Sequence, residues 1–175
     1  MTQSAKMYKQ NYGDETIYIS ATGNYDYSAS NWYAGKKTIL INAAMADTNY
    51  IRLPEATTDN LGLHVQVVIG IACLDKLYMG FVDTTIQGGA IAMGDTNEAA
   101  GGAADHASWI GDVGDGFNRI EFDLDAAAKA GGTGGTVLDF WYTGAADEVV
   151  YRGHLISEID NPTLGTHFTT TAVNA

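Results

Sequence analysis

The stretch that decides the fold is residues 61–74, which read LGLHVQVVIGIACL. Every odd-numbered position in it is apolar, whereas the even-numbered positions include His64, Gln66 and two glycines. Because side chains alternate across a strand, the pattern predicts a long β-strand with one apolar face and one mixed face. The core residues that we expect from this strand are Leu63, Val65, Val67, Ile69 and Ile71.

A second apolar run follows at 77–82, and only Asp75 and Lys76 separate the two. Two strands joined by two residues predict a β-hairpin, although the Asn-Gly pair typical of such turns is missing. Other runs rich in Ile, Val, Tyr, Phe or Trp and bounded by Gly, Asn, Asp or Pro also predict strands. They are residues 16–21, 37–42, 50–53, 117–123, 136–143 and 148–156.

Helix signals are confined to AAAKA at 126–130, which Asp123 or Asp125 could cap and Gly131 could end. This run is too short to form a helical layer. The sequence therefore predicts an all-β fold, either an antiparallel β-sandwich or a jelly-roll-like barrel.

Two kinds of segment look irregular. Residues 88–116 are rich in Gly and Ala and predict one long exposed loop with a short strand around Trp109. The chain ends, an N-terminal arm at 1–14 and a C-terminal tail at 161–175, predict extended segments that bury little by themselves. No linker divides the chain, so we expect residues 1–175 to form one β domain.

The charge balance excludes one class of function. The 175 residues contain 9 Lys and Arg against 21 Asp and Glu, a formal net charge of −12. A chain of this charge is poorly suited to binding phosphate backbones, so we expect no nucleic-acid partner. The longest apolar run is too short for a membrane span, and no secretion signal is visible. Cys73 is the single cysteine, which fits a reducing compartment and excludes an intrachain disulfide.

Catalytic and cofactor motifs are missing from the sequence. It has no GxSxG, HExxH or Walker pattern, and its four histidines have no ligand spacing, so we expect no enzyme and no cofactor. We interpret His64 as a hydrogen-bonded sheet histidine. The glycine run at 131–136 leads into a strand instead of a helix, which favours a tight turn over a phosphate site.

One acidic turn is a weak candidate for a metal site. Asp112 and Asp115 lie in GDVGDG and could lend oxygen ligands to calcium. Their spacing does not fit the EF-hand pattern, so a solvated turn is the interpretation that we favour.

Aromatic residues are concentrated near the N-terminus, among Asn, Ser and Gly. Tyr and Trp give broad contact area at low entropic cost, so this composition favours an interface over a core. The predicted partner-contact residues are Tyr8, Tyr12, Tyr25, Tyr27, Trp32 and Tyr33.

Two passages resemble the small β-rich virion proteins of tailed bacteriophages, a group that includes capsid decoration, or cement, proteins. Residues 37–70 give a strand, an extended segment ending in Leu-Pro, a polar connector and a glycine-led apolar strand. Residues 118–155 give a strand, a small-residue loop, a strand and an aromatic strand ending in Gly. The last strand departs from the usual pattern, with Val150-Tyr151 where Trp is commoner.

The resemblance implies a non-enzymatic protein made in the host cytoplasm and placed on the capsid exterior. It also implies that the chain binds the major capsid protein, bridges its subunits and forms a homotrimer. The competing interpretation is a carbohydrate- or receptor-binding β-sandwich module of a phage tail or surface protein, with the aromatic N-terminal region as its binding surface.

Overall fold

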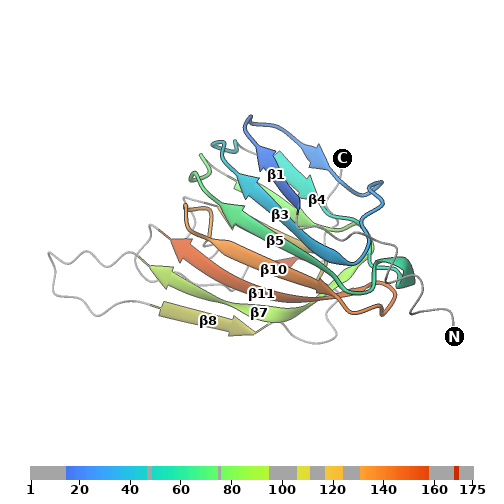
Figure 1. Cartoon of the computed structure of the whole chain (residues 1–175). Coiled ribbons are helices and arrows are strands. Elements are labelled where there is room, and N and C mark those ends of the chain that lie inside the picture. The colour runs from blue at the N-terminus through green and yellow to red at the C-terminus, as the bar shows by residue number, and fades with distance from the viewer. Residues whose placement is uncertain are drawn as a thin grey trace, which may run out of the picture.

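The computed structural model describes residues 15–46, 49–74, 76–94, 106–110, 117–123, 131–157 and 168–169, which form two β-sheets (Figure 1). The large sheet has the order β1 (Glu15–Ile19), β3 (Gly35–Ile41), β5 (Leu63–Ile69), β10 (Val137–Tyr142), β11 (Glu148–Ser157), β7 (Thr85–Gly94) and β8 (His106–Ile110). The small sheet has the order β12 (Phe168–Thr169), β9 (Arg119–Asp123), β6 (Lys76–Gly80), β4 (Asn49–Arg52) and β2 (Tyr25–Asp26). One short 3₁₀ turn, η1 (Thr58–Asn60), precedes β5.

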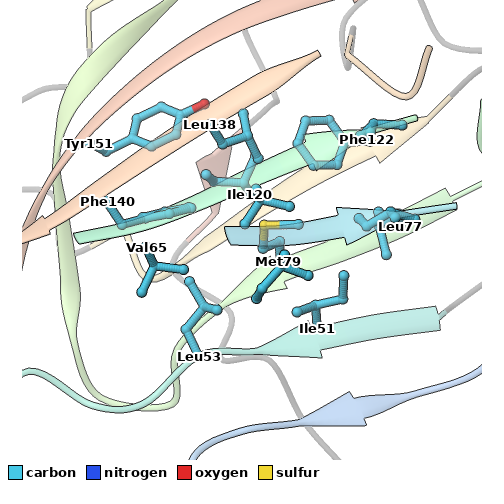
Figure 2. Packing of buried hydrophobic residues seen from close by; sticks show 14 of the residues in the cluster. Ile51, Leu53, Val65, Leu77, Met79, Ile120, Phe122, Leu138, Phe140 and Tyr151 are labelled. Atoms are coloured by element: carbon cyan, nitrogen blue, oxygen red, sulfur yellow. The ribbon is translucent and has the colours of Figure 1, made fainter. Parts of the chain in front are cut away.

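The core lies between the inner faces of the two sheets. Figure 2 shows Val65, Leu138 and Phe140 of the large sheet beside Met79 and Ile120 of the small one, and all five side chains are fully buried. β5 alternates between buried and half-buried residues, which confirms the pattern that decides the fold. Four of its predicted core residues are buried: Leu63, Val65, Val67 and Ile69. The all-β prediction and its sandwich alternative are therefore confirmed.

The prediction of purely antiparallel sheets is wrong, because the sheets are mixed. Of the ten strand pairings in the described residues, five are parallel and five antiparallel. The fifth parallel pair joins β7 to β11, and the other four arise because the chain alternates between the sheets from β1 to β6. Each of these strands then lies beside the strand two places earlier, as when Gly35 of β3 pairs with Leu63 of β5.

The predicted hairpin at 61–82 is also wrong, since β5 and β6 belong to different sheets. β5 ends at Ile69, and the next amides bond to separate segments: Gly70 N donates to Ile41 O at 2.8 Å and Leu74 N to Met45 O at 2.7 Å. These bonds take the chain across to the small sheet. Ile71, predicted in the core, is 41% exposed because it lies in this crossing.

The long loop predicted at 88–116 is wrong for its first part. β7 continues to Gly94 and pairs with β11 over ten residues. The glycines of β7 allow this strand to pack closely against β11. A Cβ on Gly88 would lie 2.0 Å from the carbonyl oxygen of Tyr151, and the φ of 134° at Gly88 suits only glycine. The short strand predicted around Trp109 is confirmed as β8.

The remaining predicted strands are confirmed as β1, β3, β4, β9, β10 and β11, with ends shifted by a few residues. No sequence pattern predicted the two-residue strands β2 and β12, of which β12 lies in the predicted C-terminal tail and pairs with β9. The N-terminal arm at 1–14 and the helix predicted at 126–130 lie outside the described residues.

Candidate functional site

The structure describes four of the six aromatic residues that were predicted to contact a partner. Tyr8 and Tyr12 lie outside the described residues. Tyr25, on β2, packs against the core, and its hydroxyl donates to Ala21 O at 2.6 Å. This ring therefore contributes to the edge of the small sheet as well as to the surface.

Tyr27 and Trp32 form a pair on the loop between β2 and β3. Their ring centroids are 5.1 Å apart and tilted by 30°, and both rings lie half-buried against the core. Burial, with a smaller contribution from Tyr25, raises the pKa of Tyr27. Tyr33 is 44% exposed, so within the described part of the set it offers the most open ring. The contact prediction itself stays a prediction.

A polar cluster occupies the outward face of the large sheet, where β5, β10 and β11 lie side by side. Asp139 of β10 is its centre and is only 6% exposed. Its Oδ1 lies 2.7 Å from His64 Nε2 and accepts from Gln66 Nε2 at 3.1 Å. Its Oδ2 lies 3.6 Å from the guanidinium of Arg152. The buried carboxylate is thus paired on both oxygens, as such a group must be to avoid a large desolvation cost.

Trp141 completes the cluster by packing against both His64 and Arg152. The ring of His64 lies parallel to the indole at 5.0 Å between centroids, and Arg152 lies 5.3 Å from the indole centroid. His64, Asp139, Arg152 and Trp141 therefore form a closed ring of contacts. The prediction of His64 as a hydrogen-bonded sheet histidine is confirmed.

The cluster lacks the parts of a nucleophilic site. No described Ser, Thr or Cys is hydrogen-bonded to His64, whose ring is held by Asp139 and Trp141. Nucleophilic catalysis needs a hydroxyl or thiol within hydrogen-bond reach of its base. The cluster links the side chains of β5, β10 and β11 on the outward face of the large sheet.

The outward face of the small sheet carries a second group of cations beside tyrosines. Arg52 pairs with Asp26 at 2.9 Å and lies 5.6 Å from the ring centroid of Tyr50. Arg119 pairs with Glu121 and lies 4.5 Å from the ring centroid of Tyr78. Each arginine is neutralised by a carboxylate on the same face, so this surface has little net charge.

Glu55 anchors the connection between the two sheets. Its carboxylate accepts from three successive backbone amides, those of Val82, Asp83 and Thr84, at 2.8, 3.2 and 2.8 Å. The hydroxyl of Thr84 accepts in turn from Ala56 N at 2.7 Å. All these bonds are internal, so Glu55 is a structural residue of the turn between β6 and β7.

The remaining candidates give no site within the described residues. Asp112 and Asp115 lie outside these residues, in which no three His, Cys, Asp or Glu side chains gather as a metal site requires. Cys73 is buried, and burial raises the pKa of its thiol to about 11. The glycine run at 131–136 forms the tight turn predicted before β10, with Gly135 N donating to Ile69 O at 2.8 Å.

No helix among the residues that the structure describes has the length and apolar content to span a membrane.

The sequence could not identify Asp139, Trp141 and Arg152 as members of one cluster. His64 and Asp139 are 75 residues apart, and only the pairing of β5 with β10 brings them together. The available signal was the lone acid at the middle of an otherwise apolar and aromatic strand, VLDFWY.

Comparison with known proteins adds no assignment. The chain was compared with protein-family models, with curated proteins and with solved structures, and none of them matches it.

Proposed function

We propose that this chain is a non-enzymatic structural protein of a phage virion, which binds the outer surface of the head and bridges major capsid protein subunits. The observation that carries the proposal is the position, within the sheets, of the two passages that resemble phage virion proteins. Residues 37–70 supply β4, β5 and most of β3, and residues 118–155 supply β9, β10 and most of β11. In the large sheet these strands are consecutive neighbours, β3-β5-β10-β11. The two passages thus form four adjacent strands of the large sheet, the part of the fold that the resemblance concerns.

The polar side chains support a structural role over a chemical one. The described clusters at His64, Glu55 and Arg119 are each closed by contacts within the chain. A binding role by contact area needs a rigid body, and a sandwich braced in this way provides it. The net charge of −12 fits a position away from packaged nucleic acid.

The test compares heads assembled without this chain to the same heads after it is added back. At full occupancy we expect a higher rupture temperature, because a ligand that binds the assembled shell alone shifts the balance toward assembly. Identical rupture temperatures at full occupancy would overturn the proposal and favour the carbohydrate- or receptor-binding function.

The mode of binding is tested with variants of the aromatic set. Deleting residues 1–12 should weaken binding, and replacing only Tyr8 and Tyr12 by Ser separates the loss of rings from the loss of chain length. Tyr33→Ser removes an exposed ring from the described body. Moderate salt should leave binding intact, because apolar and aromatic contacts are barely screened. Loss of all binding at moderate salt would contradict this contact mechanism.

A further inference from the structure

The outward face of the large sheet carries an apolar row of exposed and half-buried side chains, interrupted only by His154, that crosses six strands. The strand register places its members side by side from β1 to β7. They are Tyr18, Leu40, Val68, Val137, His154 and Ile91. The two ends are the most open of the row's apolar side chains, since Tyr18 is 68% and Ile91 48% exposed. A sheet face that only meets water normally carries polar residues in such a row.

The same face has few acidic side chains, although the chain has 21 acids against 9 basic residues. Among the described outward-facing residues of these six strands, the acids are Asp139, which is buried and paired, and Glu148 at the start of β11. Lys36 and Arg152 also face outward there. Self-association of a −12 chain is opposed by repulsion between copies, and that repulsion is smallest where exposed acids are missing.

We propose that this face binds a second copy of the chain, sheet against sheet, around a two-fold axis parallel to the strands and between β5 and β10. A two-fold interface must be complementary to itself. This axis sets the apolar row of one copy against the apolar row of the other, with strand order reversed. Val68 then lies opposite the partner's Val137, and Tyr18 lies opposite the partner's Ile91.

The charged residues also fit this axis. Arg152 lies opposite Thr38 of the partner subunit, and Lys36 lies opposite Val150 of the partner subunit, because these residues occupy the same rows at mirrored strand positions. No two like charges therefore meet. An axis perpendicular to the strands, along the row of Thr38 and Arg152, would set Leu40 against the partner's Lys36 and leave the apolar row unmatched.

The available area is sufficient for a weak, specific pair. Six strands spaced about 4.8 Å apart and three rows of outward side chains give roughly 500 Å² per copy. The total of about 1,000 Å² is at the lower limit of specific interfaces. We therefore expect a dissociation constant in the micromolar range.

This inference does not depend on the shell-binding proposal, because it concerns the isolated chain. It also differs from the homotrimer that the sequence resemblance implies. Sedimentation equilibrium of the full chain, from low micromolar to several hundred micromolar, should show a reversible monomer–dimer equilibrium. A strict monomer across this range, or a trimer, would overturn the proposal.

Paired variants at the ends of the apolar row test the register. Tyr18→Glu and Ile91→Lys should each weaken the dimer at least about tenfold, whereas the double variant should recover most of that loss at low salt. The two residues lie five strand spacings apart within one chain, about 24 Å, so they cannot pair there. Recovery therefore requires the opposed copy.

The control adds the same charge to the outward face of the small sheet. Tyr50→Glu places a carboxylate beside Arg52 and should leave the dimer unchanged. Circular dichroism confirms that each variant is folded. Equal weakening by Tyr50→Glu and Tyr18→Glu, or a double variant as weak as its singles, would overturn the proposed face.

Discussion

From β1 to β6 the chain alternates strictly between the two sheets, whereas β7 to β12 include two pairs of consecutive strands that lie side by side in one sheet, β7-β8 and β10-β11. Where two strands of the first half are neighbours, they are parallel and their paired residues are 22 to 28 positions apart in the sequence, as Glu15 with Lys37 and Gly35 with Leu63 show. In the second half, β10 and β11 join through a short turn, with Tyr142 paired to Val149.

The difference shows that the two halves set their strand register by different means. A hairpin fixes register through its turn, but a parallel neighbour reached through the other sheet is fixed by burial of one face. The halves meet at two antiparallel pairs, β5-β10 and β6-β9, one in each sheet. The core runs through both meeting points, so the halves should unfold together.

Val67→Asp is the strongest way to test that the halves are coupled. Val67 is fully buried on β5 and pairs with Leu138 of β10. An unpaired charge there should cost about 3 kcal/mol or more of unfolding free energy and destabilise both halves in one transition. Denaturant unfolding followed by circular dichroism and by tryptophan fluorescence measures this. Thr38→Asp, on the outward face of β3, is the control and should change stability little.

Two separate transitions in Val67→Asp, with one at the midpoint of the unchanged protein, would contradict the coupling of the halves. A circular dichroism spectrum dominated by helix, in any variant or the original chain, would contradict the fold itself.

Gly88→Ala tests the parallel pairing inside the second half. The added Cβ would meet the carbonyl oxygen of Tyr151 at 2.0 Å in a backbone conformation with φ of 134°. We expect a loss of about 2 kcal/mol, because β7 and β11 must separate to accept the methyl group. Gly23→Ala is the matched control, since a Cβ there has no atom within 4 Å. Equal melting temperatures for the two variants would refute the close approach of β7 and β11.

The same two regions show how far sequence reasoning reaches. Alternation of burial is local, so the core residues of β5 and the outward position of His64 followed from the pattern alone. Pairing is not local: the two-residue link at Asp75 and Lys76 predicted a hairpin, but backbone bonds from Gly70 and Leu74 to distant segments take the chain to the other sheet. The glycines of β7 predicted a loop, because the reason for them is not local. The backbone of Tyr151, whose close approach requires glycine at position 88, is 63 positions away in the sequence.

The candidate surfaces could also be predicted only in part, because they depend on strand pairing. Composition identified an aromatic N-terminal region, but burial of Tyr25, Tyr27 and Trp32 against the core depends on where β2 lies. The apolar row on the large sheet takes one residue from each of six strands, so no window of sequence contains it.

Tyr142→Phe tests a bond between the halves. The Tyr142 hydroxyl of β10 donates to Pro54 O, just after β4, at 2.9 Å in a buried site. Its loss leaves that carbonyl without this donor and should cost about 1 kcal/mol.

Burial, with a smaller contribution from Glu55, raises the pKa of Tyr142 well above its usual value of 10.0. A raised pKa favours the neutral form in the folded state, so stability from this group is present below pH 10 and is lost as the pH rises further.

The pH dependence of unfolding checks this assignment. The original chain should lose stability more steeply above pH 10 than Tyr142→Phe does. Tyr151→Phe is a second comparison, because burial also raises the pKa of Tyr151. Parallel alkaline profiles for the original chain and both variants would contradict the burial of these hydroxyls.

The smallest effect concerns the free edge of the first half, where Asp26 of β2 pairs with Arg52 of β4. Hydrogen bonding from Ser28 is the main cause that lowers the pKa of Asp26 below 3.8, and Arg52 lowers it further. A lowered pKa means that the folded state prefers the carboxylate, so this stability is present above about pH 4 and is lost as the pH falls through the folded value. Because the side chain is 39% exposed, solvent screens the pair and the contribution should stay below about 1 kcal/mol.

Asp26→Asn should therefore lower stability slightly at neutral pH and match the original chain near pH 2, as measured by thermal unfolding across that range. A difference that persists unchanged in acid would show that the β2 edge is held by packing of Tyr25 and Tyr27 and not by the charge of Asp26.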